Sequence, residues 1–176
     1  GVRDGPMRIL IIQQKMIGDV LTSSILFEAI KREHPRTELH YLIYSFTVPV
    51  ILHNPYIDKI IRYDDSNKNP INFFSFLNKI RKENYESVID IYAKLDSAII
   101  SRYSKAGIRV SYKKWYTQLF YTNCFSRNIT AQTIAGPAVE KRLRLLAPIL
   151  KNIPKEIKPK IYLTDDENLK AEQHLN

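Results

Sequence analysis

The sequence predicts an α/β fold in which a parallel sheet is covered by helices on both of its faces. Short, continuous apolar runs such as Ile9–Ile12 recur along the chain, as expected for strands that are buried on both sides. Between them lie amphipathic stretches, for example Phe73, Phe76, Leu77 and Ile80, whose spacing of three and four residues is typical of helices. Strands that alternate with helices favour right-handed βαβ units and a doubly wound sheet.

Local signals bound the elements in order along the chain. The first helix begins near Asp19 and ends before Pro35, because the residue before a proline avoids helical backbone angles. Pro137 suits the first turn of the last clear helix. Strands are expected at Met7–Gln13, Glu38–Tyr44, Asp58–Tyr63, Ser87–Tyr92 and Gly107–Ser111, and an extended segment at Lys160–Leu163. Helices are expected at 19–33, 48–53, 70–84, 96–104, 137–150 and 165–175, whereas 115–125 has no clear pattern and 152–159 resembles a linker.

Composition indicates a soluble globular domain. The chain has 176 residues, of which 44% are hydrophobic and 26% are charged. Its longest aliphatic runs have four or five residues, whereas a membrane-spanning helix needs about 20. The single cysteine, Cys124, permits no internal disulfide and is compatible with the cytoplasm. Gly1–Pro6 precedes the expected initiator Met7 and is interpreted as a cloning remnant.

The net charge of +9 concerns the partners of the protein more than its fold. Residues 94–114 contain six basic side chains and one acid, Asp96, and residues 141–160 contain seven basic side chains and one acid, Glu156. These clusters indicate an anionic ligand or surface. A basic face that is simply solvated is the alternative.

Several kinds of site are poorly supported. A dinucleotide fingerprint or a P-loop needs several glycines after the first strand, and Gly18 is alone there. The four histidines are dispersed, without the paired spacing of metal ligands. The adjacent acids Asp64-Asp65 and Asp165-Asp166 lie at element boundaries, where turn formation explains them better than metal binding. The sequence gives no pattern that indicates a nucleophilic triad.

Asp19 has two compatible interpretations. Aspartate is among the best N-cap residues, so its carboxylate is expected to accept the amide of Leu21 or Thr22. A carboxylate at the end of the first strand also lies where doubly wound sheets bind ligands, and it can accept a proton from a substrate hydroxyl. Lys15, Thr22, Ser23 and Ser24 flank it and suit a polar or phosphorylated ligand, although helix-surface solvation also explains them.

At this point the sequence resembles a known family. The opening MRILIIQQKMIGDVLTSSILFEAIKREHPRTELHYLI is similar to that of glycosyltransferase family 9, the lipopolysaccharide heptosyltransferases, with its strand, Gly-Asp-Val and helix. HNPYIDKIIRYD, NYESVIDIYAKLDSAIISRYSKAGIRVSY and AVEKRLRLLAPI resemble later family segments in the same order. The resemblance covers residues 7–150, and Gly18-Asp19 is its most specific part.

The resemblance implies the amino-terminal half of a GT-B enzyme, a Rossmann-like domain that binds the acceptor. Residues 7–153 would form this domain, and residues 154–176 would be the interdomain linker and the start of a nucleotide-sugar-binding domain. Asp19 matches the presumed general base of an inverting, metal-independent transfer. Lys15, Gly18, Thr22, Ser23 and Lys94 are the candidate acceptor contacts.

The resemblance also implies partners. We expect a nucleotide sugar such as ADP-heptose as donor, no metal or other cofactor, and a phosphorylated lipid or oligosaccharide as acceptor. The basic excess would favour peripheral contact with an anionic inner membrane from the cytoplasmic side. The fragment alone is expected to be inactive.

Two rival functions remain open from the sequence. Basic and aromatic residues alternate in KAGIRVSYKKWYTQLFYTNCF, residues 105–125, as in nucleic-acid-binding domains, although we expect no nucleic-acid partner. A non-catalytic sugar-binding domain is the second rival.

Overall fold

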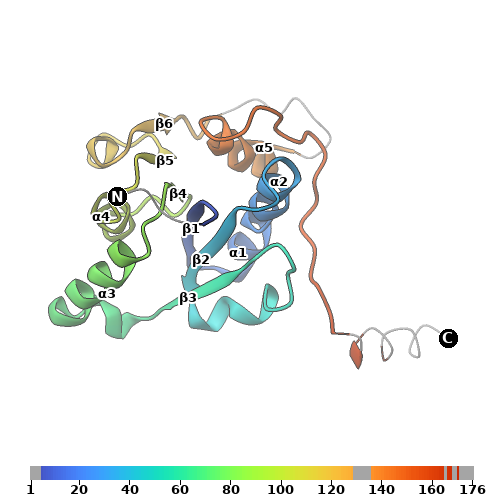
Figure 1. The fold of residues 1–176 in the computed structure, drawn as a ribbon, viewed down its shortest axis with the longest axis horizontal. Helices are drawn as coiled ribbons and strands as arrows, with labels where there is room; N and C mark the ends of the chain where they lie inside the picture. Colours follow the sequence, from blue (N-terminus) through green and yellow to red (C-terminus); the bar gives the residue numbers. More distant parts are fainter. Residues whose placement is uncertain (1–4, 129–135, 165, 168–169, 171–176) are drawn as a thin grey trace.

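The computed structural model describes residues 5–128, 136–164, 166–167 and 170, and it has a six-stranded parallel sheet at its centre (Figure 1). The strand order is β3-β2-β1-β4-β5-β6. The strands are β1 (Arg8–Gln14), β2 (Glu38–Tyr44), β3 (Lys59–Tyr63), β4 (Ser87–Asp90), β5 (Ile108–Tyr112) and β6 (Asn123–Phe125). The predicted Rossmann-like α/β architecture is therefore confirmed.

The strand order reverses direction at β1. From β1 the chain adds β2 and β3 on one side and then returns to place β4 on the other, where Ile12 is in register with Asp90. All pairs are parallel, so the carboxyl ends of β1 and β4 meet at one edge of the sheet. In doubly wound sheets, ligands bind at such a topological switch point.

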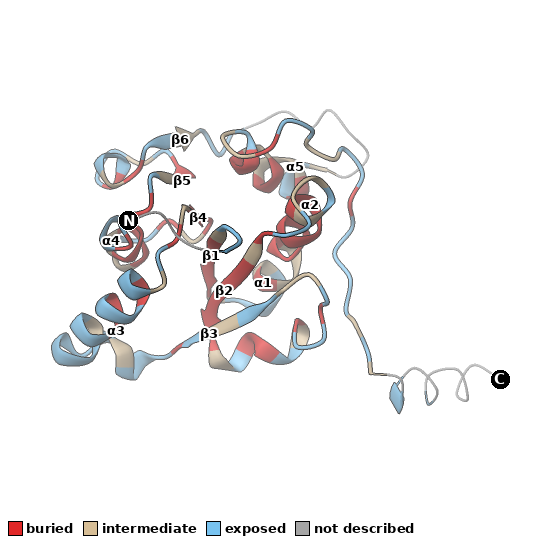
Figure 2. Cartoon of the chain, in the orientation of Figure 1, coloured by how far each residue is buried: buried red, intermediate tan, exposed pale blue. Residues whose placement is uncertain are grey.

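Helices cover both faces of the sheet, and Figure 2 shows that its central strands are buried. On one face lie α1 (Ile17–Ser23), α2 (Ile25–Glu33) and α5 (Pro137–Leu143), which pack against Ile9 and Ile11. On the other lie α3 (Pro70–Lys82) and α4 (Leu95–Tyr103), which pack with Leu10 and Ile12. Because alternate residues of β1 face two separate cores, the strand is apolar throughout rather than alternating.

Two predicted helices are divided in the structure. In place of one helix at 19–33, the structure has α1 and α2, and α1 begins two residues before the predicted start. The two helices are separated at Ser24, whose hydroxyl donates to the carbonyl of Leu21 at 2.5 Å. The segment 137–150 forms α5 followed by a 3₁₀ turn, η4 (Arg144–Leu146). Pro148 follows closely, and proline cannot donate the backbone bond that would continue a helix.

Other differences concern short elements. The helix expected at 48–53 is a 3₁₀ turn, η1 (Ser45–Val50), and further 3₁₀ turns are η2 (Asp65–Lys68) and η3 (Gln118–Phe120). Asp64 caps η2, which confirms the expected turn role of the first acidic pair. The sequence missed β6. Residues 1–4 lie outside the described residues, and so does most of the helix expected at 165–175.

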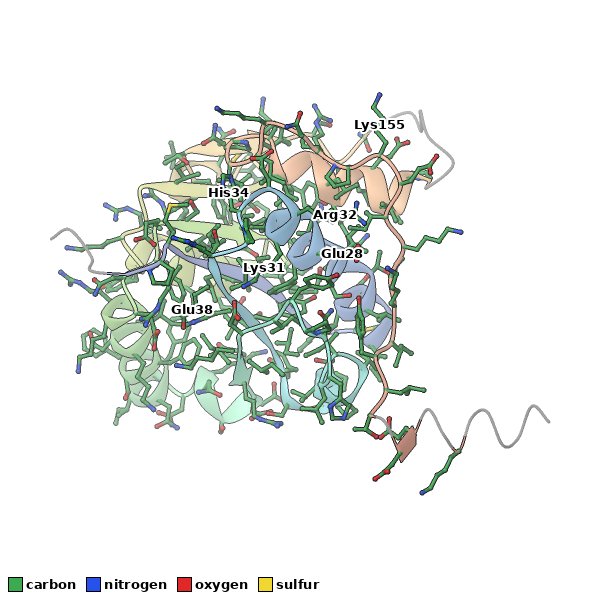
Figure 3. The ribbon with its side chains drawn as sticks, turned by 45° about the vertical axis from the view of Figure 1, so that its right-hand side comes forward. Glu28, Lys31, Arg32, His34, Glu38 and Lys155 are labelled. Atoms are coloured by element: carbon green, nitrogen blue, oxygen red, sulfur yellow. The ribbon has the colours of Figure 1, made fainter. Side chains whose placement is uncertain are left out.

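The segment after η4 runs along α2 (Figure 3). The carboxylate of Glu33 accepts the backbone amides of Lys151 and Asn152 at 2.9 and 2.7 Å. Glu28 pairs with Lys160 at 3.3 Å, and Ile157 is buried in the same core as α2. The start of the predicted linker thus packs on the domain.

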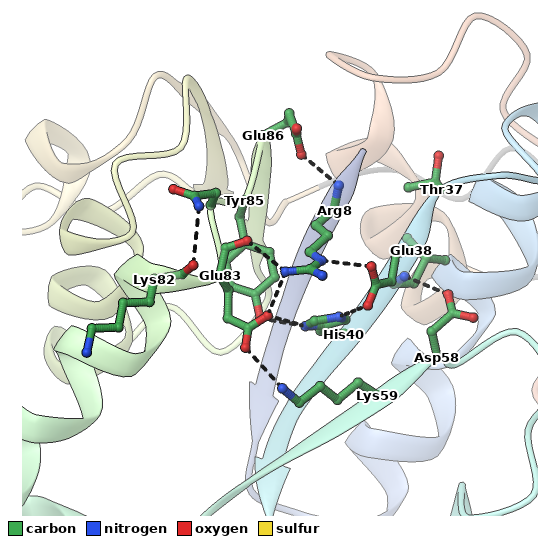
Figure 4. A network of polar contacts seen from close by, with 12 residues as sticks. Arg8, Thr37, Glu38, His40, Asp58, Lys59, Lys82, Glu83, Tyr85 and Glu86 are labelled. Carbon is green, nitrogen blue, oxygen red and sulfur yellow. Dashed lines mark hydrogen bonds and ion pairs between the residues drawn. The ribbon is translucent and has the colours of Figure 1, made fainter. Parts of the chain in front are cut away.

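A polar network fastens the amino edge of the sheet, opposite the switch-point edge (Figure 4). Arg8 at the start of β1 pairs with Glu38 of β2 at 2.7 Å and with Glu83 at 3.1 Å. The buried His40 forms hydrogen bonds with the carboxylate of Glu38 at 2.9 Å and with the hydroxyl of Tyr85 at 2.7 Å. Hydrogen bonds from His40 and Arg8 lower the pKa of Glu38 to about 2.

Candidate active site

A cavity of about 400 Å³ opens at the switch point, where β1 and β4 end. Among the described residues that line it, Asp19 is the one carboxylate. The cationic lining residues come from the β1 and β4 ends, from the segment after β6 and from α5, and they are Lys15, Lys94, Arg127, Lys141 and Arg142. Five cations around one carboxylate give a cavity that attracts anionic ligands.

Asp19 is the third residue of α1, not its N-cap. The helix begins at Ile17, and Met16 precedes it without any side-chain cap. The predicted N-cap role is therefore wrong, because the first turn starts two residues before the aspartate. One carboxylate oxygen, Oδ1, accepts from Nη2 of Arg142 at 3.1 Å, and no described residue bonds Oδ2. With its side chain 49% exposed, Asp19 contributes its carboxylate to the cavity lining.

Arg142 of α5 is held by three hydrogen bonds. Besides Asp19, its Nε donates to the hydroxyl of Ser23 at 2.8 Å and its Nη1 to the carbonyl of Ala138 at 2.9 Å. Ser23 in turn donates to Oε1 of Gln13 at 2.6 Å. A buried polar chain thus runs from the end of β1 through Ser23 and Arg142 to the Asp19 carboxylate, and it fixes the orientation of that carboxylate.

The structure divides the five predicted acceptor contacts. Lys15 and Lys94 line the cavity with Asp19. Ser23 is completely buried beneath Arg142, and it is not among the residues that line the cavity. Thr22 donates to the carbonyl of Gly18 at 2.8 Å, and neither residue is among those that line the cavity.

Aromatic rings accompany the two lysines. Nζ of Lys15 lies 4.9 Å from the ring centroid of Tyr44, and Nζ of Lys94 lies 6.0 Å from that of Tyr92. These cation–π contacts position flexible side chains while leaving the ammonium groups available to an anion.

Sequence reasoning missed several lining residues. Tyr92 ends the predicted fourth strand, so its position at the switch point was a usable signal. Lys141 and Arg142 belong to the basic cluster 141–160, which indicates an anionic ligand but does not indicate that α5 reaches the switch point. Arg127 follows the stretch without a clear pattern and gives no such signal.

Gly18 has ordinary helical geometry, and the positive φ angles of this turn belong to Gln14 (55°) and Met16 (69°). A methyl group added to Gly18 would meet no atom within 4 Å. We therefore expect Gly18→Ala to raise the free energy of unfolding by about 0.5–1 kcal/mol through its helix propensity, as measured by urea denaturation. An unchanged or lower free energy of unfolding would contradict this expectation.

Asp90 ends β4 beside the cavity and is completely buried. Its carboxylate accepts from the hydroxyl of Tyr121 at 2.5 Å and from the amide of Ala93 at 2.9 Å. Burial nevertheless raises the pKa of Asp90 to about 6, and the hydrogen bonds only partly oppose this shift.

This raised pKa predicts a pH dependence of stability. The folded state holds the Asp90 proton more tightly than the unfolded state, so stability falls as the pH rises from about 4 to about 6. Relative to Asp90→Asn, the wild type should lose roughly 3 kcal/mol across that window, at 1.36 kcal/mol per pKa unit. Urea denaturation of both proteins between pH 4 and pH 7 measures the difference. A difference that does not change with pH would contradict the assignment.

Within the described residues, no three His, Cys, Asp or Glu side chains gather as metal ligands. The same part of the chain contains no helix long and apolar enough to span a bilayer.

Comparisons with known proteins agree with the geometry. The family model described as glycosyltransferase family 9 (heptosyltransferase) matches residues 73–176. Lipopolysaccharide heptosyltransferase 3 of Escherichia coli is 25% identical over 139 residues, which cover 75% of this chain and 40% of that protein. Lipopolysaccharide heptosyltransferase 1 of Campylobacter coli is 30% identical over 96 residues, which cover 54% of this chain and 28% of that protein.

Solved structures share the fold. A glycosyl transferase family 9 structure from Veillonella parvula superposes with a TM-score of 0.73 at 18% identity, covering 98% of this chain and 50% of that one. The structure of the E. coli heptosyltransferase WaaC with ADP superposes with a TM-score of 0.68 at 20% identity, covering 86% of this chain and 50% of that one. The chain thus spans about half the length of these GT-B structures. Because the family model matches more than half of its residues, this chain belongs to glycosyltransferase family 9, the heptosyltransferase family.

Proposed function

We propose that this chain is the acceptor-binding half of an inverting, metal-independent glycosyltransferase. The enzyme would transfer heptose or a related sugar from a nucleotide sugar to a lipopolysaccharide core or a similar surface glycan. The observation that carries the proposal is the Asp19 carboxylate, held by Arg142 at 3.1 Å inside a cationic cavity at the switch point.

Asp19 would act as general base through Oδ2, the oxygen that does not accept from Arg142. As the acceptor oxygen attacks the anomeric carbon of the donor, its proton passes to Oδ2 of Asp19. The new glycosidic bond forms while the bond from the anomeric carbon to the nucleotide diphosphate breaks, and the diphosphate leaves with the electron pair. Attack from the face opposite the leaving group inverts the anomeric configuration. A weak base suffices, because the hydroxyl loses its proton late, when the sugar already resembles an oxocarbenium ion.

The cations of the cavity would bind the acceptor. Lys15 and Lys94 enter from the ends of β1 and β4, on either side of the switch point, and Lys141 and Arg127 also line the cavity. Acceptor phosphates or carboxylates would pair with these groups, which fits a phosphorylated lipid or oligosaccharide. Positive charge from side chains is also what lets a reaction with a diphosphate leaving group proceed without a divalent cation.

A transfer assay with the full-length protein tests this function. ADP-heptose and a phosphorylated, heptose-free core acceptor are incubated with the protein, with and without EDTA, and the product is analysed by NMR. We expect transfer in both samples and an anomeric configuration opposite to that of the donor. Retained configuration or loss of activity with EDTA would overturn the inverting or the metal-independent part of the proposal.

A further inference from the structure

One long edge of the domain carries positive charge without any carboxylate in its sequence. No Asp or Glu occurs between Asp96 and Glu140. The basic residues in this interval are Arg102, Lys105, Arg109, Lys113, Lys114 and Arg127. In the fold they belong to the end of α4, to β5, and to the segments that flank β6, so they gather at one side of the sheet (Figure 1).

The crossover from β5 to β6, residues 113–122, presents large apolar side chains to solvent on this edge. Leu119 is 91% exposed and Trp115 is 86% exposed, the highest values among the large hydrophobic residues that the structure describes. Tyr116 packs edge-on against Trp115 with a centroid distance of 5.5 Å. Lys113 is exposed beside them. Apolar side chains interleaved with cations are typical of surfaces that bind an anionic interface.

The crossover is held rigidly in this arrangement. Lys114 donates to the carbonyl of Ala93 at 2.5 Å, and buried Tyr121 donates to Asp90. The guanidinium of Arg109 donates to the carbonyl of Phe120 at 2.9 Å. Both ends of the crossover are thus fastened to the domain, and Trp115 and Leu119 project from the segment between these two anchors.

A basic hollow adjoins the crossover. Arg81, Arg102, Tyr103 and Lys105 line a depression of about 410 Å³. Arg109 connects the hollow with the crossover, because its guanidinium donates to the carbonyl of Phe120 in the crossover and to the carbonyl of Ala106, next to Lys105. We define the crossover face as residues 102–105 together with residues 113–122.

We propose that the crossover face docks on an anionic lipid bilayer, with Trp115 and Leu119 inserted at the interface and the cations facing headgroup phosphates. The proposal deepens the proposed function, and rests on it only in that a lipid-linked acceptor needs the enzyme at a membrane. Charge complementarity identifies the occupant: cations alone would suit any polyanion, whereas an exposed leucine and tryptophan gain from an apolar layer beneath the phosphates. Residues 151–164 run along the other side of the domain, and so do not cover this face (Figure 1).

Vesicle sedimentation of the full-length protein tests the proposal. Vesicles of phosphatidylcholine that contain roughly 30–40% phosphatidylglycerol are compared with vesicles of pure phosphatidylcholine, each at low and at high salt. We expect Trp115→Ser and Leu119→Ser each to weaken partitioning to the anionic vesicles about tenfold. Lys113→Gln should weaken it about fivefold at low salt. Ile161→Ser removes an exposed apolar side chain (57%) from the opposite side and should bind as the wild type does.

Three results would overturn membrane docking: no preference of the wild type for anionic vesicles, unchanged binding of the Trp115 and Leu119 variants, or tighter retention of a single-stranded oligonucleotide than of vesicles. Transfer to a soluble, delipidated acceptor separates this proposal from the function itself. If docking fails but the function holds, the wild type still transfers sugar to the soluble acceptor. If the function fails, that transfer is missing whatever the vesicles show.

Discussion

Replacing Asp19 by asparagine is expected to lower kcat of the full-length enzyme by about 10²–10⁴-fold, the usual contribution of a general base. Asparagine keeps the shape of the side chain, and its Oδ1 can still accept from Arg142, which lies 3.1 Å from that atom in the structure. The amide cannot take the acceptor proton. The rate of nucleotide release at saturating donor and acceptor measures the loss, and KM for the acceptor should change little.

The fold should survive this substitution. The Asp19 side chain is half exposed, and the loss of a negative charge in the first turn of a helix costs at most about 1 kcal/mol. Asp166→Asn, an exposed acid beyond the extended segment 151–164, serves as the matched control and should have wild-type activity. A near wild-type rate for Asp19→Asn with an unchanged melting temperature would exclude Asp19 as the base.

The sheet could be predicted because its strands are buried on both faces. The predicted strand Glu38–Tyr44 has the same bounds as β2, and the predicted bounds of β1 and β3 differ from the observed ones by at most one residue. The reason is that the two faces of the sheet pack against two separate cores, so these strands are apolar on both faces and do not alternate with polar residues. β6 escaped prediction for the opposite reason: it has three residues, lies at the sheet edge, and is exposed or half-buried. Its pairing with β5 comes from tertiary context rather than from its own composition.

The candidate site could be predicted only where the chain leaves a central strand. Asp19, Lys15 and Lys94 follow the ends of β1 and β4, and parallel strands bring those ends together. Arg142 is 123 residues from Asp19 and enters from α5, so only packing reveals the pair. The same limit explains the cap error, because a helix start displaced by two residues turns a capping carboxylate into one that faces the cavity.

Arg142→Ala is expected to reduce both stability and rate. The substitution removes three hydrogen bonds from a side chain that is only 9% exposed, and leaves the Ser23 hydroxyl with one partner fewer in the core. At about 1 kcal/mol for each bond, the free energy of unfolding should fall by about 3 kcal/mol in urea denaturation. Without its anchor the Asp19 carboxylate rotates more freely, and misplacement of a catalytic group by about 1 Å costs up to about 10²-fold in kcat.

Two controls separate the positioning role of Arg142 from its structural role. Arg144→Ala, two residues further along, removes an exposed hydrogen bond of 3.3 Å to the carbonyl of Ser126 and a cation–π contact with Phe125 at 5.5 Å. It should change neither quantity much. Arg142→Lys retains the charge, but a single ammonium cannot reproduce the guanidinium contacts to Ser23 and Asp19, so stability should recover more than the rate does.

The double variant Asp19→Asn with Arg142→Ala gives the decisive comparison. If Arg142 acts on the reaction through the Asp19 carboxylate, its removal costs no further kcat once that carboxylate is an amide, while the loss of stability persists. Independent rate losses that multiply in the double variant would show that Arg142 does not act through the Asp19 carboxylate. The coupling in kcat therefore reports the pair itself, because a purely structural arginine would lower stability in both backgrounds and leave no coupling in the rate.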